Sequence, residues 1–584
     1  MPCSVRRSFA SLLLIAGTLT APSGLAASAE TEPQTSVESS ELPAQSALQD
    51  QTQLPTATEI KGARPRVNDE AVPSAATTLP DDLLPLAAPP SLALPAEPDQ
   101  VKIRELRPLT LEQAERLVEV NNPSLKAAES QVEQAKSALL AALSAWYPTI
   151  NLTANGLPQY FESEQYRNPD FAPSRIDPNT GAPEAEVQPY TNSSQWRASF
   201  SAQVQWNLID PARVPEIAAA RDNYEKARDT YLITLRELRL NTATLYFALQ
   251  RQDEQVRIGQ QSVRVSLVSL RDARARFEAG VATKLEVLEA ETQLARDQQL
   301  LSNALGDQDK ARRGLASLLN LPQDVTPTAA SPARVRGLWQ PSLQESIVAA
   351  YAFREELDRF ILDISINNSN ANAALAAVQP LLSLVNTYSA FKTQGQTGVQ
   401  PQIGVDMDDY SWSSSNTIAL NATWNIFDGG RARALYRQNK QRAQESEFNF
   451  ASERDRIRQE VEESFYDLRT ANQDIYTTSR EVLSSRESLR LARLRFQAGV
   501  TTQREVVDTQ RDLTNAEVRY ANAVTSYNTS LAQLQRRTGL DQVMACPSLT
   551  LGSAKPAEDM EYSVPIEPTP SRPACEASML ASEG

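Results

Sequence analysis

The sequence predicts an α+β membrane protein in which long helical hairpins and four β-strands come from two copies of one unit. Three observations carry this prediction: a turn motif that occurs twice, long charged segments rich in Ala and Leu on both sides of each copy, and alternating segments of membrane-barrel length. Because the unit is duplicated, the 584 residues are expected to form one architecture rather than several domains.

The turn motif reads R-F-E-A-G-V-A-T-K-L-E at 276–286 and R-F-Q-A-G-V-T-T-Q-R-E at 495–505. Gly280 and Gly499 supply the left-handed residue that ends one helix without steric cost. Thr283 and Thr502 are placed to begin the next helix, each with a glutamate three residues later in a capping-box pattern. Each copy therefore predicts a helical hairpin whose tip has about four residues.

The helices on either side of the tips have matching lengths in the two copies. Each copy begins with a helix of about 35 residues, which starts near Leu111 or Leu343. A long helix of about 69 residues runs to each tip, and a return helix of about 39 residues follows. The second return helix has apolar residues at alternating gaps of four and three, which predicts coiled-coil packing. These residues are Tyr520, Val524, Tyr527, Leu531 and Leu534.

The segments between first and long helices have a period of two. Apolar and polar residues alternate strictly over 196–208, which predicts a two-faced strand of membrane-barrel length with aromatic residues toward both ends. Its lipid-facing residues are expected to be Trp196, Phe200, Val204 and Trp206. The counterpart at 412–427 alternates more weakly, but its W-N-I-F-D resembles the W-N-L-I-D that ends the first.

Partner strands are expected to begin at the Pro-flanked segments 148–152 and 380–384. Four strands cannot close a barrel, and an open sheet edge is not tolerated in lipid. The chain is therefore predicted to complete its barrel by oligomerising.

Composition excludes several classes of function. The chain has no histidine, which removes His-based triads and His zinc sites. Its net charge of -15 argues against nucleic acid as a partner. No nucleotide-binding glycine motif stands between strand and helix. We expect no enzyme activity, no catalytic residue, no metal and no cofactor.

The N-terminal part predicts export. Residues 1–29 have a signal-peptide pattern, with Arg6 and Arg7 before a short apolar run and Ala27-Ser28-Ala29 as a cleavage site. Residues 30–107 form a Pro-rich leader that is expected to be disordered, because its composition buries too little apolar surface. The leader is either a tether that spans a cell wall or an extension without a partner.

The rest of the chain divides into a first repeat at 108–330, a second repeat at 331–540 and a C-terminal tail at 541–584 that is expected to be disordered. Cys546 and Cys575 lie in this tail. In an oxidising compartment they either form a disulfide or remain two unpaired thiols.

The duplicated F-x-A-G-V-x-T tip, the W-N-[LI]-[IF]-D strand exit, the signal peptide and the order of helices and strands resemble the TolC family of outer-membrane efflux proteins. The resemblance covers about residues 105–540. It implies a homotrimer in the outer membrane, with a twelve-stranded barrel in lipid and a long periplasmic tunnel. Such proteins are passive exit ducts for drug efflux or type I secretion. They work with a periplasmic adaptor (membrane fusion) protein and an inner-membrane pump of the RND, ABC or MFS type.

The resemblance also implies a pore constriction formed by Glu505 and Asp508, which are spaced i, i+3 and share a helix face. Rings of acidic side chains favour cations. Glu505 has a second interpretation, as the capping-box partner of Thr502, whereas Asp508 lies too far along the helix for that role. Glu286 and Glu289 repeat the spacing on the other hairpin, where capping and surface roles are expected.

The tips are expected to dock the adaptor because they lie farthest from the membrane. The residues concerned are Phe277, Gly280, Val281, Thr283, Phe496, Gly499, Val500 and Thr502. In the best-known family member a tyrosine and an arginine near the tip lock the closed mouth. The matching residues here are Phe496 and Thr501, so a gate locked by those bonds is not expected. Glu505 with Arg504 or Arg495 is the substitute that this tip offers.

An alternative function stays open from the sequence: a secreted periplasmic coiled-coil scaffold or adaptor without a barrel. The strict alternation at 196–208 distinguishes the two, because an all-helical scaffold has no need of a two-faced strand.

Overall fold

The structure is a computed structural model that describes residues 75–166, 179–180, 190–397, 409–540, 542–546, 573 and 575–576. The chain divides into Met1–Ile60 and Lys61–Gly584, and all described residues belong to the second unit. The expected signal peptide at 1–29 therefore lies outside the described residues. Within the described part, no helix is both long and apolar enough to cross a membrane.

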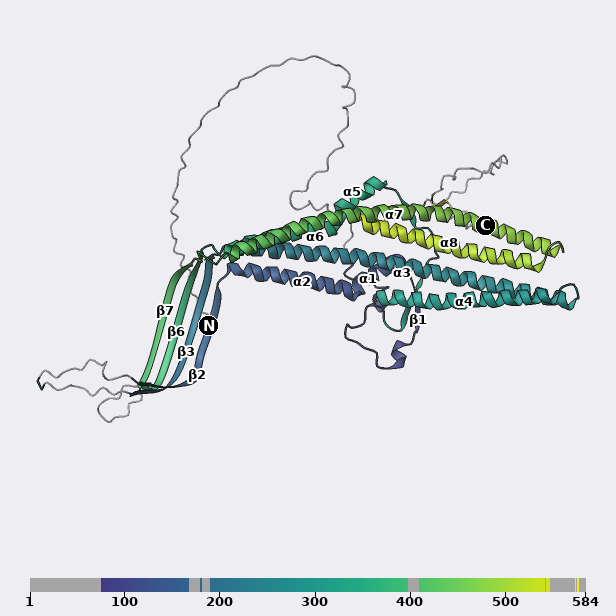
Figure 1. Cartoon of the computed structure of the whole chain (residues 1–584). Helices are drawn as coiled ribbons and strands as arrows, with labels where there is room; N and C mark the ends of the chain where they lie inside the picture. Colours follow the sequence, from purple (N-terminus) through teal and green to yellow (C-terminus); the bar gives the residue numbers. More distant parts are fainter. Residues whose placement is uncertain are drawn as a thin grey trace, which may run out of the picture. The chain divides into compact units, whose positions relative to one another are not determined.

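The two repeats have the same order of elements, as the sequence predicts (Figure 1). The first repeat consists of β1 (Glu105–Leu109), α1 (Leu111–Asn121), α2 (Pro123–Leu143), β2 (Thr149–Tyr166), β3 (Tyr190–Ile209), α3 (Arg213–Glu278), α4 (Lys284–Leu318) and β4 (Val325–Ala329). The second consists of β5 (Gly337–Trp339), α5 (Leu343–Phe353), α6 (Glu355–Ala376), β6 (Leu381–Thr397), β7 (Asp409–Thr423), α7 (Arg431–Gln497) and α8 (Gln503–Thr538), and β8 (Val543–Ala545) follows it.

The four long strands form one antiparallel sheet in the order β2-β3-β6-β7. They lie side by side in Figure 1, with the two repeats meeting at β3 and β6. The register places Phe200 of β3 between Ala154 of β2 and Ala390 of β6. The strand starts at Thr149 and Leu381 agree with the prediction. From these starts β2 runs to Tyr166 and β6 to Thr397.

The long helices pack as hairpins. α3 has 66 residues and α7 has 67, and their return helices have 35 and 36, close to the predicted lengths. α3 contacts α4 in the first hairpin and α8 of the second, and Figure 1 shows both hairpins turning at the same end. The coiled-coil residues Tyr527, Leu531 and Leu534 of α8 are buried in a core shared with α7.

The two tips have the same backbone hydrogen bonds. The Val281 N–H donates to the Arg276 carbonyl at 2.9 Å, and the Gly280 N–H donates to the Phe277 carbonyl at 3.0 Å. The Val500 and Gly499 N–H groups repeat these bonds at the same distances. This is the Schellman end, in which the glycine takes a left-handed conformation, with φ of 74° at Gly280 and 73° at Gly499.

The first helix of each repeat was expected to be continuous, and this is wrong: both are broken. In the first repeat the break falls at Asn122, because Pro123 has no N–H to continue the helix. The Asn122 side chain then caps α2 by accepting from the Ser124 N–H at 2.8 Å. In the second repeat the break falls at Arg354, whose backbone is extended.

The break at Arg354 is held by a buried group of charges. The Arg354 guanidinium donates to Glu356 at 3.0 Å and to Glu460 of α7 at 2.7 Å. Arg536 of α8 donates to the same Glu356 carboxylate at 2.7 Å. Arg354 is 3% exposed, so its charge depends on these carboxylates for compensation. The chain therefore leaves the helical conformation where this arginine turns inward.

The leader was expected to be disordered up to residue 107, and this is wrong for its last part. Leu83 and Leu86 are buried in the core of the first repeat. The Asn121 side chain donates to the Leu86 carbonyl at 2.8 Å, and the Glu119 carboxylate accepts from the Ala76 N–H at 2.6 Å. Residues of this segment therefore pack on α1, which composition alone does not indicate.

The tail from 541 was likewise expected to be disordered, and its described residues are not. β8 pairs antiparallel with β5, with Val543 opposite Trp339. Cys546 forms a disulfide with Cys575, which settles the alternative left open by the sequence. Cys575 is buried in the core of the second repeat. The disulfide therefore attaches the tail to this core, which also includes residues of α5, α6, α7 and α8.

The buried charges predict a pH dependence of stability. Burial raises the pKa of Glu356, but hydrogen bonds and charge from Arg354 and Arg536 outweigh burial and lower it to about 2. Because the folded pKa is depressed, the stabilisation is present above the unfolded pKa near 4.5 and is lost as the pH falls toward 2. Glu356→Gln is expected to destabilise the helices by roughly 3 kcal/mol at pH 7, measured by unfolding followed with circular dichroism.

The gap between Glu356→Gln and the natural protein should shrink as the pH falls from about 4.5 toward 2. Glu462→Gln is the control, because Glu462 pairs with Arg458 on the helix surface at 2.9 Å. Such a surface pair is expected to be worth less than about 1 kcal/mol. A gap for Glu356→Gln that does not change with pH would contradict the charge-based explanation.

Candidate functional site

One face of the four-stranded sheet is apolar. The predicted lipid-facing residues Trp196, Phe200, Val204 and Trp206 alternate along β3 and therefore share this face. Trp196, Phe200 and Trp206 are exposed in the chain. The register adds exposed apolar side chains from the other three strands. These are Ile150, Leu152, Tyr160, Tyr388, Tyr410, Trp412, Ile418 and Leu420.

The aromatic residues on this face lie toward its two ends. Tyr160 packs on Trp196 with ring centroids 5.2 Å apart. Tyr410 and Trp412 of β7 lie at the same end of the sheet as this pair. Trp206 lies at the end that leads into the helices. Its indole N–H donates to the Trp146 carbonyl at 3.0 Å. Aromatic side chains at both borders of an apolar band are typical of barrels in membranes.

The opposite face of the sheet is polar. Its rows consist mainly of Ser, Thr, Asn and Gln, for example Asn151, Gln203, Thr387 and Thr417. Cross-strand hydroxyl bonds join Ser389 to Ser415 at 2.8 Å and Thr393 to Ser411 at 2.5 Å. A sheet with one apolar and one polar face fits a wall between lipid and a watery interior.

The hairpin tips carry the predicted acidic pair. Glu505 does not form the capping box expected with Thr502, although Thr502 is the N-cap of α8. Its carboxylate instead accepts from the Thr501 hydroxyl and pairs with Arg495 of α7 at 3.1 Å. The capping box does form at the first tip, between Thr283 and Glu286. The expected capping box between Thr502 and Glu505 is therefore wrong. The Glu505 carboxylate binds to other residues of its own hairpin tip.

Asp508 lies one turn farther along α8. Its carboxylate is 3.3 Å from Arg511 and 3.8 Å from Arg504. Both pairs lie on the helix surface at spacings of three and four residues. The predicted constriction residues Glu505 and Asp508 thus share a helix face, each beside an arginine of its own hairpin.

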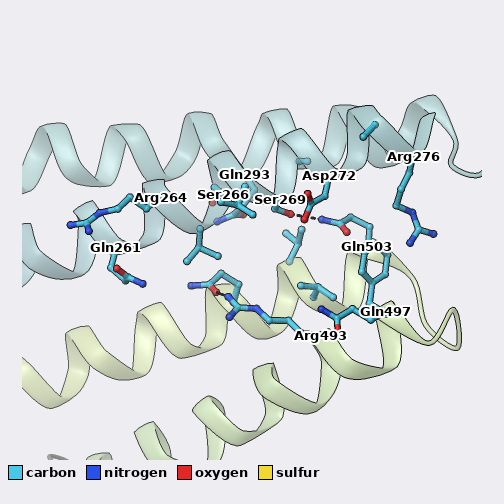
Figure 2. Close-up of a pocket in the computed structure, with 18 residues that line it drawn as sticks. Gln261, Arg264, Ser266, Ser269, Asp272, Arg276, Gln293, Arg493, Gln497 and Gln503 are labelled. Carbon is cyan, nitrogen blue, oxygen red and sulfur yellow. Dashed lines mark hydrogen bonds between the residues drawn. The ribbon is translucent and has the colours of Figure 1, made fainter. Parts of the chain in front are cut away.

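A groove of about 810 Å³ separates the two hairpins near their tips (Figure 2). The Gln503 side chain bridges the groove by donating to the Ser269 hydroxyl of α3. The Arg276 guanidinium lies 4.4 Å from the ring centroid of Phe496. Arg493 donates to Gln510 at 3.0 Å, and burial lowers the pKa of Arg493. The two hairpins are therefore joined by polar and cation–π contacts near the tips.

The sequence analysis did not identify these bridging residues. The duplicated motif contained one signal, because Gln503 occupies the place of Lys284 in the first repeat. Gln503 is 2% exposed, whereas Lys284 is an exposed residue. Gln503, which differs between the two tips, thus contacts Ser269 across the groove, whereas the motif has the same residue types at the positions of Arg276 and Phe496 in both copies.

The comparisons with known proteins agree with this geometry. A family model described as outer membrane efflux protein matches residues 116–321 and 350–540. No curated protein sequence matches the chain. Solved structures that resemble the fold include CusC, the outer-membrane channel OprN and the MtrE outer membrane channel of Neisseria gonorrhoeae in its open state.

The likeness to these structures extends over nearly their whole length. CusC has a TM-score of 0.58 at 17% identity and covers 79% of this chain and 99% of its own. OprN has a TM-score of 0.56 at 18% identity and covers 82% and 98%. MtrE has a TM-score of 0.55 at 18% identity and covers 83% and 98%. At such identities the likeness concerns the fold.

The resemblance to the TolC family that the tip and strand-exit motifs indicated is confirmed by the family model, which spans both repeats. The fold class is confirmed as well: long helical hairpins and four β-strands from two copies of one unit. The family is one of transport channels rather than enzymes. The chain belongs to the outer membrane efflux protein family.

Proposed function

We propose that the chain is a passive exit duct in the outer membrane. It assembles as a homotrimer, each protomer contributes its four strands to a twelve-stranded barrel, and the helical hairpins form a tunnel in the periplasm. The observation that carries this proposal is the two-faced sheet, whose edge strands β2 and β7 each have one edge without a strand partner among the described residues. Pairing β7 of one copy with β2 of the next closes the wall and satisfies both edges.

The duct works with two partners that the family's architecture implies. A periplasmic adaptor protein joins it to an inner-membrane pump of the RND, ABC or MFS type, in a tripartite efflux pump or a type I secretion system. Cargo then crosses the periplasm and outer membrane without an energy source in the duct itself. The alternative of a secreted scaffold leaves the exposed apolar face of the sheet without a role.

Residues 108–330 and 331–540 act in this proposal as two repeats of one wall, each supplying two strands and one hairpin. Phe277 and Val281 of the first tip, together with Val500 of the second, are exposed apolar side chains. They adjoin Gly280 and Gly499, whose added Cβ atoms would meet nothing within 4 Å. The proposed docking surface for the adaptor comprises these tips together with Thr283, Phe496 and Thr502.

The second tip is proposed to constrict the tunnel mouth. In a trimer, Glu505 and Asp508 place six carboxylates around the axis. Arg495 and Arg511 balance these charges locally within each chain. A ring in which carboxylates face the axis and arginines stand behind them favours cations at the mouth while limiting how tightly they are held.

The first prediction from this proposal tests assembly and the lipid-facing strand. Protein solubilised from outer-membrane fractions is expected to have the mass of three chains. Val204→Lys places a charge on the apolar face of β3 and should lower barrel assembly, because a lysine at mid-bilayer costs about 2–4 kcal/mol. Gln203→Lys, on the polar face of the same strand, is the control and should assemble normally.

A stable monomer that contains a complete barrel would overturn the proposed trimer. Equal loss of assembly in the two lysine variants would instead show that the alternation along β3 does not separate lipid from lumen.

The second prediction tests docking. Photo-crosslinkers at Val281 and Val500, which are 67% and 69% exposed, should capture a periplasmic adaptor in cells. Phe448 in the first third of α7, far from the tip, is similarly exposed and serves as the control. Capture from Phe448 and never from the tips would reject tip docking.

The third prediction tests the constriction. Glu505→Gln with Asp508→Asn should lower the cation preference of single channels in lipid bilayers and weaken block by multivalent cations, because six carboxylates leave the mouth. Glu286→Gln with Glu289→Gln removes the same charge at the same spacing from the first hairpin. Equal effects from both pairs would contradict an assignment to the second repeat. The trimer mass should be unchanged in either variant.

A further inference from the structure

Arg197 stands out on the polar face of the sheet. It alternates with the apolar residues Trp196 and Ala198 on β3, and its register partners are Gln159 of β2 and Thr393 of β6. On β2, β3 and β6 the other polar-face residues are uncharged, and the register of β7 places Asp409 on this face opposite Gly395. Among the described residues of these three strands, Arg197 is therefore the one cation on the polar face.

The guanidinium of Arg197 is held in place from two sides. It lies over the ring of Phe161 at 3.6 Å from the centroid, and its Nε donates to the Gln195 Oε1 atom at 3.4 Å. Gln195 is in turn fixed by donating to the Ser193 hydroxyl at 2.8 Å. A cation–π stack of this kind is worth about 0.5–2 kcal/mol. Arg197 is therefore a positioned group rather than a freely rotating surface arginine.

The two terminal nitrogens of Arg197 make no hydrogen bond or ion pair with the residues that the structure describes, and only its Nε is bonded, to Gln195. They carry four N–H groups in a planar arrangement that suits two oxygens of a carboxylate or phosphate. Phe391 lies on the same face of β6, opposite Ser199, and is 41% exposed. A cation and an accessible aromatic ring thus lie next to each other on the polar face.

We propose that Arg197, in three copies, forms an anion-binding ring inside the barrel, at the end that carries the β2–β3 and β6–β7 connections. The inference rests on the proposed trimer, in which the polar face lines the lumen. The ring takes anionic groups of passing cargo, carboxylates or phosphates, and Phe391 contacts an apolar part beside such a group. It lies at the opposite end of the duct from the acidic tips.

The ring acts independently of the tips. The 66 residues of α3 alone separate the sheet from the tip by about 100 Å of helix. Charges so far apart are screened from one another, because the Debye length at physiological ionic strength is about 8 Å. The sign of charge at the tips therefore does not determine the sign inside the barrel.

The test measures block of single trimers in planar bilayers by inositol hexakisphosphate, added from the side of the β2–β3 connections. The natural protein should be blocked, and Arg197→Gln should raise the half-blocking concentration about tenfold or more, which corresponds to about 1.4 kcal/mol. Arg197→Lys keeps the charge without the planar donor pair and should show a smaller rise.

Lys392→Gln is the matched control. Lys392 is opposite Ala198 in the neighbouring row of the sheet, on the apolar face, with Nζ 4.8 Å from the Tyr410 ring centroid. The Lys392→Gln substitution removes the same charge as Arg197→Gln, one residue away along the strands, and should leave the block unchanged. Equal loss of block in Lys392→Gln and Arg197→Gln would overturn the ring, since only the general field would then matter.

The remaining outcomes separate this inference from the proposed function. Conducting trimers whose block is unaffected in both Arg197 variants would overturn the ring and leave the duct intact. Natural protein that forms no trimer and no channel would overturn both. If Arg197→Gln does not assemble, Arg197→Lys is measured in its place. Anion binding at this site would be rejected if inositol hexakisphosphate blocks Arg197→Lys as well as it blocks the natural protein and inorganic phosphate does not block the channel.

Discussion

The outer edges of β2 and β7, which have no strand partner among the described residues, set the constraint on which the rest of the structure depends. In water such an edge is a liability that a protein can shield, but in lipid each unsatisfied N–H or C=O costs several kcal/mol. The apolar face of the sheet requires lipid, so the edges must pair with further strands. Closure around an axis then fixes the positions of everything attached to the strands, including the hairpins and their tips.

The link between strands and helices is itself duplicated. The indole N–H of Trp206 donates to the Trp146 carbonyl, and that of Trp424 donates to the Val378 carbonyl, both at 3.0 Å. Each bond joins the end of a strand pair to the end of the helix that leads into it. Because the same bond occurs in both repeats, the two hairpins leave the sheet by equivalent geometry. The likeness of the two repeats at the sheet therefore extends into the hairpins that lead to the tips.

Much of this architecture could be predicted from the sequence because its causes are local. A left-handed glycine after Arg-Phe-x-Ala specifies each tip, and alternation specifies β3 without reference to its partners. The break at Asn122 also had a local signal, an N-cap residue followed by proline, which the helical pattern concealed. Such features need only a few neighbouring residues to determine the backbone.

Other features have distant causes and were missed for that reason. Arg354 ends a helix because its charge meets Glu460, which lies 106 residues away in the chain. Leu83 belongs to no periodic segment, so its burial depends on the presence of α1. At the second tip, Glu505 has the capping-box spacing but finds Arg495 and Thr501 instead. Spacing identifies candidates, and the competing partners decide among them.

The two tips show how duplicated backbones acquire different chemistry. Glu286 closes a capping box on its own helix, while Gln503 turns away from solvent to reach Ser269 across the groove. The second tip thus gives up a local cap and gains contacts with the first hairpin, and its carboxylate at Glu505 is held by an arginine of the same tip. The two matching glutamates are therefore held differently: Glu505 by Arg495 and Thr501, and Glu286 by its capping box with Thr283.

A passive duct also limits how strongly any site within it can bind. Cargo that is held tightly blocks the passage, so charged groups in the wall must attract ions weakly enough to release them. Arg197 satisfies this limit through its contacts, because Phe161 covers one face of the guanidinium and the Gln195 side-chain oxygen accepts a hydrogen bond from Nε. What remains for an anion is the outer edge of one planar group per chain. A site of this kind influences which ions enter the barrel without enclosing them, which suits a wall past which cargo moves.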